Sequence, residues 1–570
     1  MTSGTPTLTS LAAAILFAAS SFSAFAAVPD DIRALAASAK LAPKQAQRPY
    51  DERDWLERFY SARAYAPAWV DNVPKATSAI VQLRAAPVHG LSPSEYNADE
   101  LEKRLAKASP DDAALDVALT RAMLHYLADL RVGRVRSEFH SAAPDPRLKA
   151  FDPVEQLRAG LAENRLAALA AAAEPKIPLY ARIKTTLAHY RELALAPAVT
   201  LPPVAKGKKI EVNAAYPQAG ALRALLVLVG DAPGAAPVGP DDRYTPDLFE
   251  AVKRFQARHG LQDDGVLGRE TVAALNTPLA ARVRQLELTL ERMRWLPDFT
   301  PGPIIAVNLP AYRLWAFDTS AGKPDPVLEM RVIVGSAVKT ETPLFIGSMR
   351  YLEFNPFWNV PRSIERGEII PKMQKNPAYL VDNDMEMVSL KGGATTQQAD
   401  SGTIEALRAG DYRVRQRPGP QNALGAVKFA MPNPDSIYLH STSARELFKR
   451  TRRDLSHGCI RVEKPQELAE FVLASRPDWD KEKIAAAMEP GESKTVTLKA
   501  PIPVVLFYTT ATTDADNRPV FSPDVYLRDP MLEKLLASHG SAPAAKAAVK
   551  VEAKVAPKVA AKIAAKVAPK

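Results

Sequence analysis

A single cysteine, Cys459, is the only thiol in this chain of 570 residues. No intramolecular disulfide can therefore hold the fold together, so each domain depends on its own apolar core. Hydrophobic residues make up 47% of the sequence, which is ordinary for a globular protein and allows such cores. A chain of this length predicts about three or four domains.

The amino terminus has the features of an export signal. Apolar residues run from 11 to 17 and continue to 27, and Ala24 and Ala26 flank Phe25 as at a cleavage site. We therefore predict a signal peptide over residues 1–26. The first ten residues contain no Lys or Arg, so an uncleaved segment that anchors the chain in a membrane is the alternative. In an oxidising compartment the single thiol would remain free.

Two helical regions come next. Residues 29–203 are rich in Ala, Leu and Arg, show helical spacing of apolar residues and lack any nucleophile or metal-ligand spacing, so we predict a helical scaffold domain. In residues 215–278, Thr245 and Pro246 start a helix that Gly260 ends. The patterns Phe-Gln-x-x-His-Gly-Leu and Asp-Gly-x-x-Gly-x-x-Thr in this region resemble the small helical peptidoglycan-binding domain of cell-wall enzymes.

From residue 300 to 510 the sequence predicts a β-rich domain. Short β-branched and aromatic runs are separated by Pro, Gly and Asp, for example at 304–308, 313–317, 330–334, 345–354 and 427–429. Residues 356–417 have mixed helix and loop signals and interrupt the strands, so we predict that they form an inserted subdomain. Residues 511–540 then make a carboxy-terminal extension.

The cysteine lies in the tetrapeptide Ser456-His457-Gly458-Cys459, and His440 precedes Ser456 by 15 intervening residues. A thiolate nucleophile needs a nearby base and donors for the oxyanion that its attack creates. The histidines offer the base, and the glycine lets backbone N–H groups approach a carbonyl. The alternative is a small, buried, unreactive cysteine.

The expected secondary structure brings these residues together. In a strand over 436–440, alternation puts Tyr438 and His440 on one face. Residues 444–450 can form a short helix that returns the chain to the tetrapeptide and brings Cys459 beside His440.

His440, its spacing and the run from Ser456 to Arg461 resemble the catalytic signature of the L,D-transpeptidase family. Residues 355–361, 417–429 and 438–440 resemble the large periplasmic subclass, which adds a helical scaffold, a peptidoglycan-binding domain and a capping insertion. The resemblance covers about residues 45–510. It implies an α+β multidomain protein whose β-rich catalytic domain carries the cap at 356–417, and a periplasmic location. The uncharged amino terminus and the carboxy-terminal tail depart from the family pattern.

The resemblance also implies a mechanism. Cys459 would attack the diaminopimelate carbonyl of a tetrapeptide stem, expel D-Ala and form a thioester that a second stem amine resolves into a diaminopimelate–diaminopimelate cross-link. His440 would act as the base that keeps the thiol anionic. Backbone N–H groups of His457, Gly458 and Cys459 would form the oxyanion hole.

The remaining candidate residues have two interpretations each. Ser456 and His457 are expected to shape the loop. Arg461 can orient a substrate carboxylate or form a structural ion pair. Tyr438 and Trp358 can line the cleft or only pack. No cofactor is expected, and a zinc site is the weaker interpretation because two histidines and a cysteine lack a carboxylate partner.

Two other functions share these features. Water in place of the amine would give a carboxypeptidase or a cross-link-cleaving endopeptidase of the same fold. A non-catalytic scaffold that binds the cell wall is the third possibility, and the complete His440 and Cys459 set argues against it. Peptidoglycan is the expected partner in each case, and an exported chain argues against nucleic acid.

The net charge of +10 is concentrated at the carboxy terminus. Residues 541–570 contain seven lysines and one glutamate, hence +6, in a background of Ala, Val and Pro. Proline disfavours a long helix here, so we predict a disordered cationic tail that binds anionic surfaces.

Overall fold

The computed structural model describes residues 28–40, 48–137, 139, 145–234, 242–322 and 325–538. The signal peptide expected at 1–26 and the lysine tail expected at 541–570 lie outside these ranges. Within them, no helix is both long and apolar enough to cross a bilayer.

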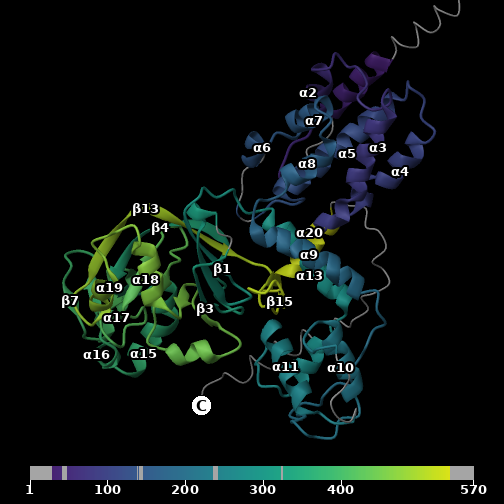
Figure 1. Ribbon diagram of the computed structural model, residues 1–570. Helices are drawn as coiled ribbons and strands as arrows, with labels where there is room; N and C mark the ends of the chain where they lie inside the picture. Colours follow the sequence, from purple (N-terminus) through teal and green to yellow (C-terminus); the bar gives the residue numbers. More distant parts are fainter. Residues whose placement is uncertain are drawn as a thin grey trace, which may run out of the picture.

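The amino-terminal part is a bundle of helices around one buried helix (Figure 1). That helix, α5 (Ala113–Val132), starts at Asp112, whose carboxylate accepts from the backbone N–H of Leu115 at 2.8 Å. The buried carboxylate of Asp116 accepts hydrogen bonds from three successive backbone N–H groups at 68–70, which ties the chain before α3 to the bundle. The surrounding helices are α2 (Trp55–Ser61), α3 (Val73–Arg84), α4 (Ala98–Leu105), α6 (Arg147–Ala150), α7 (Pro153–Ala162) and α8 (Leu166–Ala173).

Helix α9 (Pro178–Leu193) packs against α13 (Leu279–Met293) through a shared apolar cluster, although 85 residues separate them in the chain. Between them in sequence lies the small domain of α10 (Ala219–Leu228), α11 (Pro246–Arg258) and α12 (Arg269–Leu275), which has its own core. Thr245 and Pro246 begin α11, and Gly260 follows its end with φ of +63°. His259 is buried against Phe255, so this histidine packs the small domain.

The β-rich part contains a nine-stranded sheet in the order β11-β3-β12-β10-β9-β4-β13-β1-β2. Helices α18 (Pro465–Leu473) and α19 (Lys481–Met488) contribute to the core on one of its faces. The fold is therefore the α+β, multidomain arrangement that the sequence predicts. The strands are β1 (Pro303–Asn308), β2 (Arg313–Asp318), β3 (Leu328–Gly335), β4 (Phe345–Phe354), β9 (Val427–Ala430), β10 (Leu439–His440), β11 (Asp454–Ser456), β12 (Ile460–Val462) and β13 (Lys494–Phe507).

A second, four-stranded sheet lies between β4 and β9 in sequence, two strands that pair with each other in the main sheet. It has its own core and packs four short helices and a π-helical turn against its strands. Its elements are β5 (Trp358–Asn359), α14 (Arg362–Ile364), the π-helix η4 (Glu365–Ile369), α15 (Ile370–Lys375), α16 (Tyr379–Asp382), β6 (Met385–Ser389), β7 (Thr395–Thr396), α17 (Ser401–Ala409) and β8 (Tyr412–Gln416). We refer to residues 358–416 as the insertion.

The carboxy-terminal residues return to the helical domains (Figure 1). A hairpin of β14 (Ala511–Thr513) and β15 (Pro519–Phe521) is followed by α20 (Arg528–Ala537). Phe521 packs against Tyr190 of α9 and His259 after α11, with ring centroids 5.4 and 5.5 Å apart. The extension therefore joins the sheet, the α9–α13 pair and the small domain.

Candidate active site

The candidate residues lie on two adjacent strands in the middle of the sheet. Strands β10 and β12 are parallel, with Leu439 opposite Ile460 and His440 opposite Arg461. Leu439 and Ile460 are fully buried in the core, so alternation directs His440 and Arg461 to the other face. Tyr438 and Cys459 directly precede these strands at the same level, since Ile460 donates its N–H to the Tyr438 carbonyl at 3.1 Å.

The expected strand over 436–440 is shorter in the structure, where only residues 439 and 440 are paired. The cause is a turn that Asn433 holds: its side chain bonds the backbone N–H and C=O of Ile437 at 3.0 and 2.7 Å. Ser436 adopts a left-handed conformation with φ of +54°. The expected helix over 444–450 is a 3₁₀ helix, η5 (Arg445–Lys449).

His440 is buried and has one tautomer fixed by its neighbour. Its Nδ1 lies 2.6 Å from the carbonyl oxygen of Ser441, which can only accept, so Nδ1 carries the proton and Nε2 is left as the basic nitrogen. Burial and the charge of Arg461 lower the pKa of His440 to about 3. The imidazole is therefore neutral at physiological pH.

Cys459 is half-buried, and burial raises the pKa of its thiol. The neighbouring Tyr438 and the charges of Lys428 and Arg461 lower that pKa but do not outweigh burial. The free site thus holds a neutral thiol and a neutral imidazole. This differs from the expectation that His440 keeps the thiol anionic before substrate arrives.

The sulfur faces the turn before β10. Cys459 Sγ donates to the carbonyl oxygen of Ser436 at 3.7 Å. The Tyr438 ring also contacts the His440 ring, with centroids 5.7 Å apart, and Lys428 lies 5.0 Å from its face. Tyr438 therefore lies beside His440 at the candidate site, and Trp358 packs against the core of the insertion.

The loop before the cysteine is held by side chains on both sides. Ser456 Oγ accepts from the Gly458 N–H at 3.1 Å and donates to the Cys459 carbonyl at 2.6 Å. Gly458 adopts φ of +117°, a conformation that favours glycine. Because its N–H is taken by Ser456, the donors that face no acceptor among the described residues are the N–H groups of His457 and Cys459.

A buried threonine supports this loop from the strand β3 side. Thr342 Oγ1 donates to the Gly458 carbonyl at 2.7 Å and accepts from the Gly335 N–H at 2.8 Å. Tyr526, from the carboxy-terminal extension, donates to the Gly335 carbonyl at 2.6 Å and accepts from the Thr342 N–H at 3.3 Å. No sequence spacing pointed to Thr342 or Tyr526, because Thr342 is 116 residues from Gly458 and Tyr526 is 191 residues from Gly335.

The insertion also contacts the loop directly. His457 Nε2 lies 2.6 Å from a carboxylate oxygen of Glu368 in η4, and both side chains are nearly half exposed. The contact joins residues 89 positions apart, which sequence analysis missed. It places the insertion over the edge of the candidate site.

Arg461 lies beside the cysteine, and the carboxylate of Glu446, which acts on its charge, forms no ion pair with it among the described residues. Its Nε atom is buried and has no hydrogen-bond partner in that part of the chain. Burial lowers the pKa of its guanidinium. The structural ion pair, one of the two interpretations of Arg461, is therefore absent from the part of the chain that the structure describes.

Fold and site define a multidomain protein with a β-rich domain that carries a cysteine and a histidine on neighbouring strands. Three family models match it: a scaffold domain at residues 54–187, a "putative peptidoglycan binding domain" at 218–275 and an L,D-transpeptidase catalytic domain at 302–501. The part of the chain that holds the candidate site, residues 302–501, is thus similar to the catalytic domain of L,D-transpeptidases.

Similar proteins carry related names. A "Putative L,D-transpeptidase" of Haemophilus influenzae is 34% identical over 298 residues, which is 50% of this chain and 58% of that relative's length. Among solved structures, an L,D-transpeptidase from Xylanimonas cellulosilytica is 15% identical, with a TM-score of 0.18 over 55% of this chain and 100% of its own. One from Stackebrandtia nassauensis is 13% identical, with a TM-score of 0.22 over 54% and 97%. These TM-scores are too low to support a structural argument.

Proposed function

We propose that this protein is a peptidoglycan L,D-transpeptidase that joins the stem peptides of the cell wall through Cys459. The observation that carries the proposal is that His440 and Arg461 share one face of two adjacent strands, and that Tyr438 and Cys459 directly precede these strands at the same level. The match to an L,D-transpeptidase catalytic domain supports it.

In the first step, Cys459 Sγ attacks the carbonyl carbon of diaminopimelate in a tetrapeptide stem. The thiol proton passes to His440 Nε2 as the C–S bond forms, because this nitrogen carries the lone pair. The N–H groups of His457 and Cys459 stabilise the oxyanion. The C–N bond to D-Ala then breaks, and the imidazolium gives its proton to the leaving amine.

In the second step, the side-chain amine of another stem attacks the thioester carbonyl. His440 takes a proton from that amine, the C–S bond breaks, and the sulfur recovers the proton as thiol. The products are the cross-linked stems and the starting form of the site. Water in place of the amine would give hydrolysis by the same sequence of bonds.

Substrate binding would also make His440 a stronger base. The positive charge of Arg461 is one of the causes that lower the pKa of His440. A stem carboxylate that pairs with Arg461 offsets this charge, so the imidazole becomes a stronger base only when a stem is bound. Arg461 would therefore both orient the stem and switch on the base.

The domains also suggest where the protein acts. Peptidoglycan lies outside the cytoplasm, and the peptidoglycan-binding and catalytic domains imply an extracytoplasmic protein with peptidoglycan as its partner. A periplasmic location, with residues 1–26 as the signal, is the specific form of this proposal.

The test is mass analysis of the products that purified protein makes from a diaminopimelate tetrapeptide. We expect dimers that have lost one D-Ala, and we expect Cys459→Ala to make none while melting at nearly the same temperature. Products that carry water in place of the second stem would favour the hydrolase. Equal turnover by Cys459→Ala would overturn the nucleophile assignment.

A further inference from the structure

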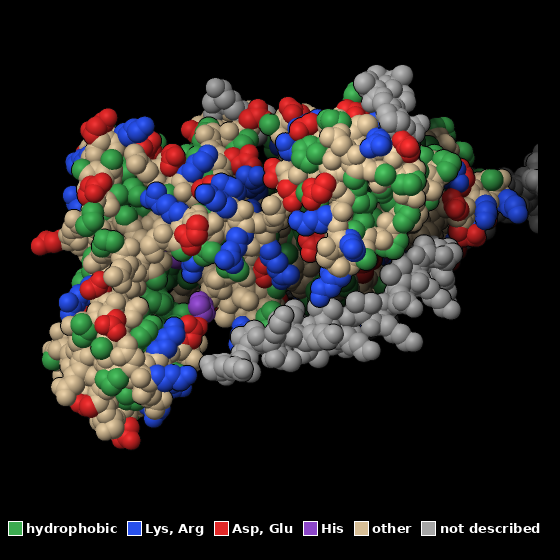
Figure 2. Space-filling model, turned by 90° about the horizontal axis from the view of Figure 1, so that it is seen from below, with side chains coloured by type: hydrophobic (Ala, Val, Ile, Leu, Met, Phe, Trp, Pro, Cys, Tyr) green, Lys and Arg blue, Asp and Glu red, His purple; other side chains and the backbone are tan. Residues whose placement is uncertain are grey.

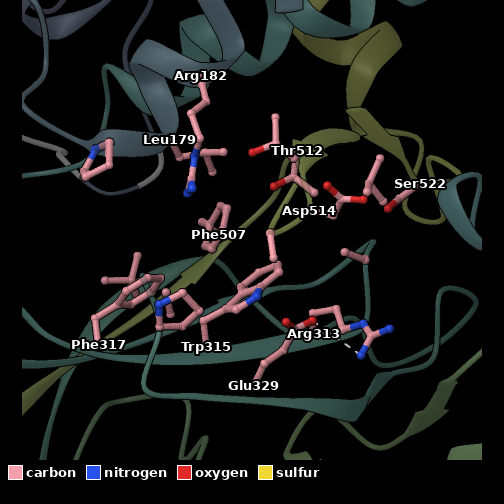
Figure 3. A pocket seen from close by; sticks show the side chains of 18 of the residues that line it. Leu179, Arg182, Arg313, Trp315, Phe317, Glu329, Phe507, Thr512, Asp514 and Ser522 are labelled. Carbon is pink, nitrogen blue, oxygen red and sulfur yellow. Dashed lines mark ion pairs between the residues drawn. The ribbon is translucent and has the colours of Figure 1, made fainter. Parts of the chain in front are cut away.

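A second cleft, of about 1500 Å³, lies between the catalytic domain and the helical domains (Figure 3). Its walls come from residues 175–182 before and in α9, 254–263 at the end of α11, strands β1 to β3, and the β14–β15 hairpin. Neither Cys459 nor His440 lines it. Pockets for small molecules measure about 300–1,000 Å³, so this cleft suits an extended chain better than a compact ligand.

One wall of the cleft is an aromatic sheet face. Leu314, Ala316 and Leu506 are fully buried in the core of the catalytic domain. Alternation along β2 and β13 therefore turns Trp315, Phe317 and Phe507 to the opposite face, where they line the cleft (Figure 3). Trp315 and Phe317 are partly exposed, and Phe507 is buried. A partly exposed aromatic surface is typical of a ligand-binding groove.

The opposite wall and the rim supply positive charge. Arg182 of α9 projects toward the aromatic face (Figure 3), and its buried Nε atom has no hydrogen-bond partner among the described residues. Its guanidinium forms a long ion pair, at 3.8 Å, with the exposed carboxylate of Asp325. Lys449 and Arg450 stand exposed at the rim. Lys and Arg side chains gather near the middle of the molecular face that Figure 2 shows.

We infer that this cleft binds a glycan strand of peptidoglycan, with sugar rings on the Trp315 face and stem carboxylates on Arg182. This inference rests on the proposed function, because it assigns a second contact with the same polymer. Residues 254–263 of the wall belong to the segment matched as a peptidoglycan-binding domain, so the cleft continues that domain toward the sheet. Aromatic faces stack on sugars, and a guanidinium fork pairs with a carboxylate.

The inference is tested with glycan chains of several disaccharide units, either bearing tetrapeptide stems or stripped of them. Affinities are measured by calorimetry with the Cys459→Ala protein, so that no turnover intervenes. We expect Trp315→Ala to weaken both ligands about tenfold or more. Arg182→Gln should weaken only the stem-bearing chain. The matched control is Arg158→Gln on α7, which lies outside the cleft.

The same substitutions are also made in the protein that retains Cys459, and the turnover of a free tetrapeptide by these variants is measured. This measurement separates the inference from the proposed function. The turnover should stay within about twofold of the wild-type rate, because the Cys459 site is elsewhere. Chains that bind both variants as tightly as the control would overturn the inference. If Trp315→Ala lowers the melting temperature, Trp315→Leu keeps an apolar side chain and should still lose the stripped glycan; retained binding would again overturn it.

Discussion

At the scale of single residues, the site depends on which groups carry charge before substrate binds. Burial lowers the pKa of His440 to about 3 and raises the pKa of Cys459, so the resting pair is neutral. A neutral imidazole cannot hold a thiolate by its charge, but it can accept the proton as the sulfur attacks.

The neutral pair predicts a separation between thiol reactivity and turnover. His440→Ala should abolish transpeptidation, yet the rate of Cys459 alkylation near pH 7 should change by less than about threefold, because no imidazolium charge is lost. The wild-type alkylation rate should rise with pH to a midpoint above the usual range of a cysteine, since burial raises this pKa. A large drop in alkylation by His440→Ala would instead indicate a resting ion pair.

We expect Arg461 to affect both the binding of the stem and the pKa values of His440 and Cys459. Arg461→Gln removes a charge that lowers the pKa of Cys459, so the alkylation profile should move to higher pH. Loss of a charged hydrogen bond of about 1.5–3 kcal/mol should raise KM for the stem about 10- to 100-fold. The control is Arg476→Gln, at a partly buried arginine that pairs with Asp478. An amidated stem that discriminates between wild type and variant as strongly as the acid would argue against carboxylate recognition.

At the scale of elements, the strands were predictable and their supports were not. The runs at 304–308 and 345–354 gave β1 and β4 because β-branched and aromatic residues alternate there. The sequence analysis did not predict helix α13. Its apolar residues do repeat with helical spacing, but the side that they form packs against the distant α9. These residues are Leu279, Val283, Leu286 and Leu290. The contacts of Glu368 with His457 and of Thr342 with Gly458 depend on tertiary packing, which no local pattern encodes.

The element that supports the cysteine loop can be tested at Thr342. Thr342→Val keeps the shape but removes the bond to Gly458 and leaves the Gly335 N–H unpaired, a cost of about 1–3 kcal/mol. We expect kcat to fall about tenfold with KM nearly constant, because the loop and its oxyanion donors shift. Thr342→Ser, which retains the hydroxyl, should restore kcat. Failure of serine to do so would assign the effect to packing.

The insertion should be held at the site by Glu368. Glu368→Gln removes the charge that faces His457, while the nearby Lys372 remains. We expect KM for long stems to rise severalfold and the melting temperature to stay within a degree or two, since exposed ion pairs contribute about 0–1 kcal/mol. Glu405→Gln, on α17 in the same insertion, is the control. Unchanged kinetics would show that this contact does not position the insertion.

At the scale of the whole molecule, Phe521 joins three parts of the chain. It is almost fully buried, contacts Tyr190 and His259, and lies under the Arg282 guanidinium at 4.8 Å from its ring centroid. Truncating a buried phenylalanine costs about 3–5 kcal/mol. Phe521→Ala should therefore loosen the helical domains from the sheet, seen as faster proteolysis between residues 194 and 218 and a larger radius of gyration in solution scattering.

Turnover of a free tetrapeptide by Phe521→Ala should remain above about half of the wild-type rate, because the Cys459 loop keeps its bonds to Thr342. Binding of long glycan chains should weaken, because the cleft walls separate. Phe354→Ala, which removes the ring stacked on Trp479 inside the catalytic domain, should show the reverse pattern, with turnover lost and the domain junction intact. Equal proteolysis of the Phe521→Ala and wild-type proteins would show that other contacts fix the domains.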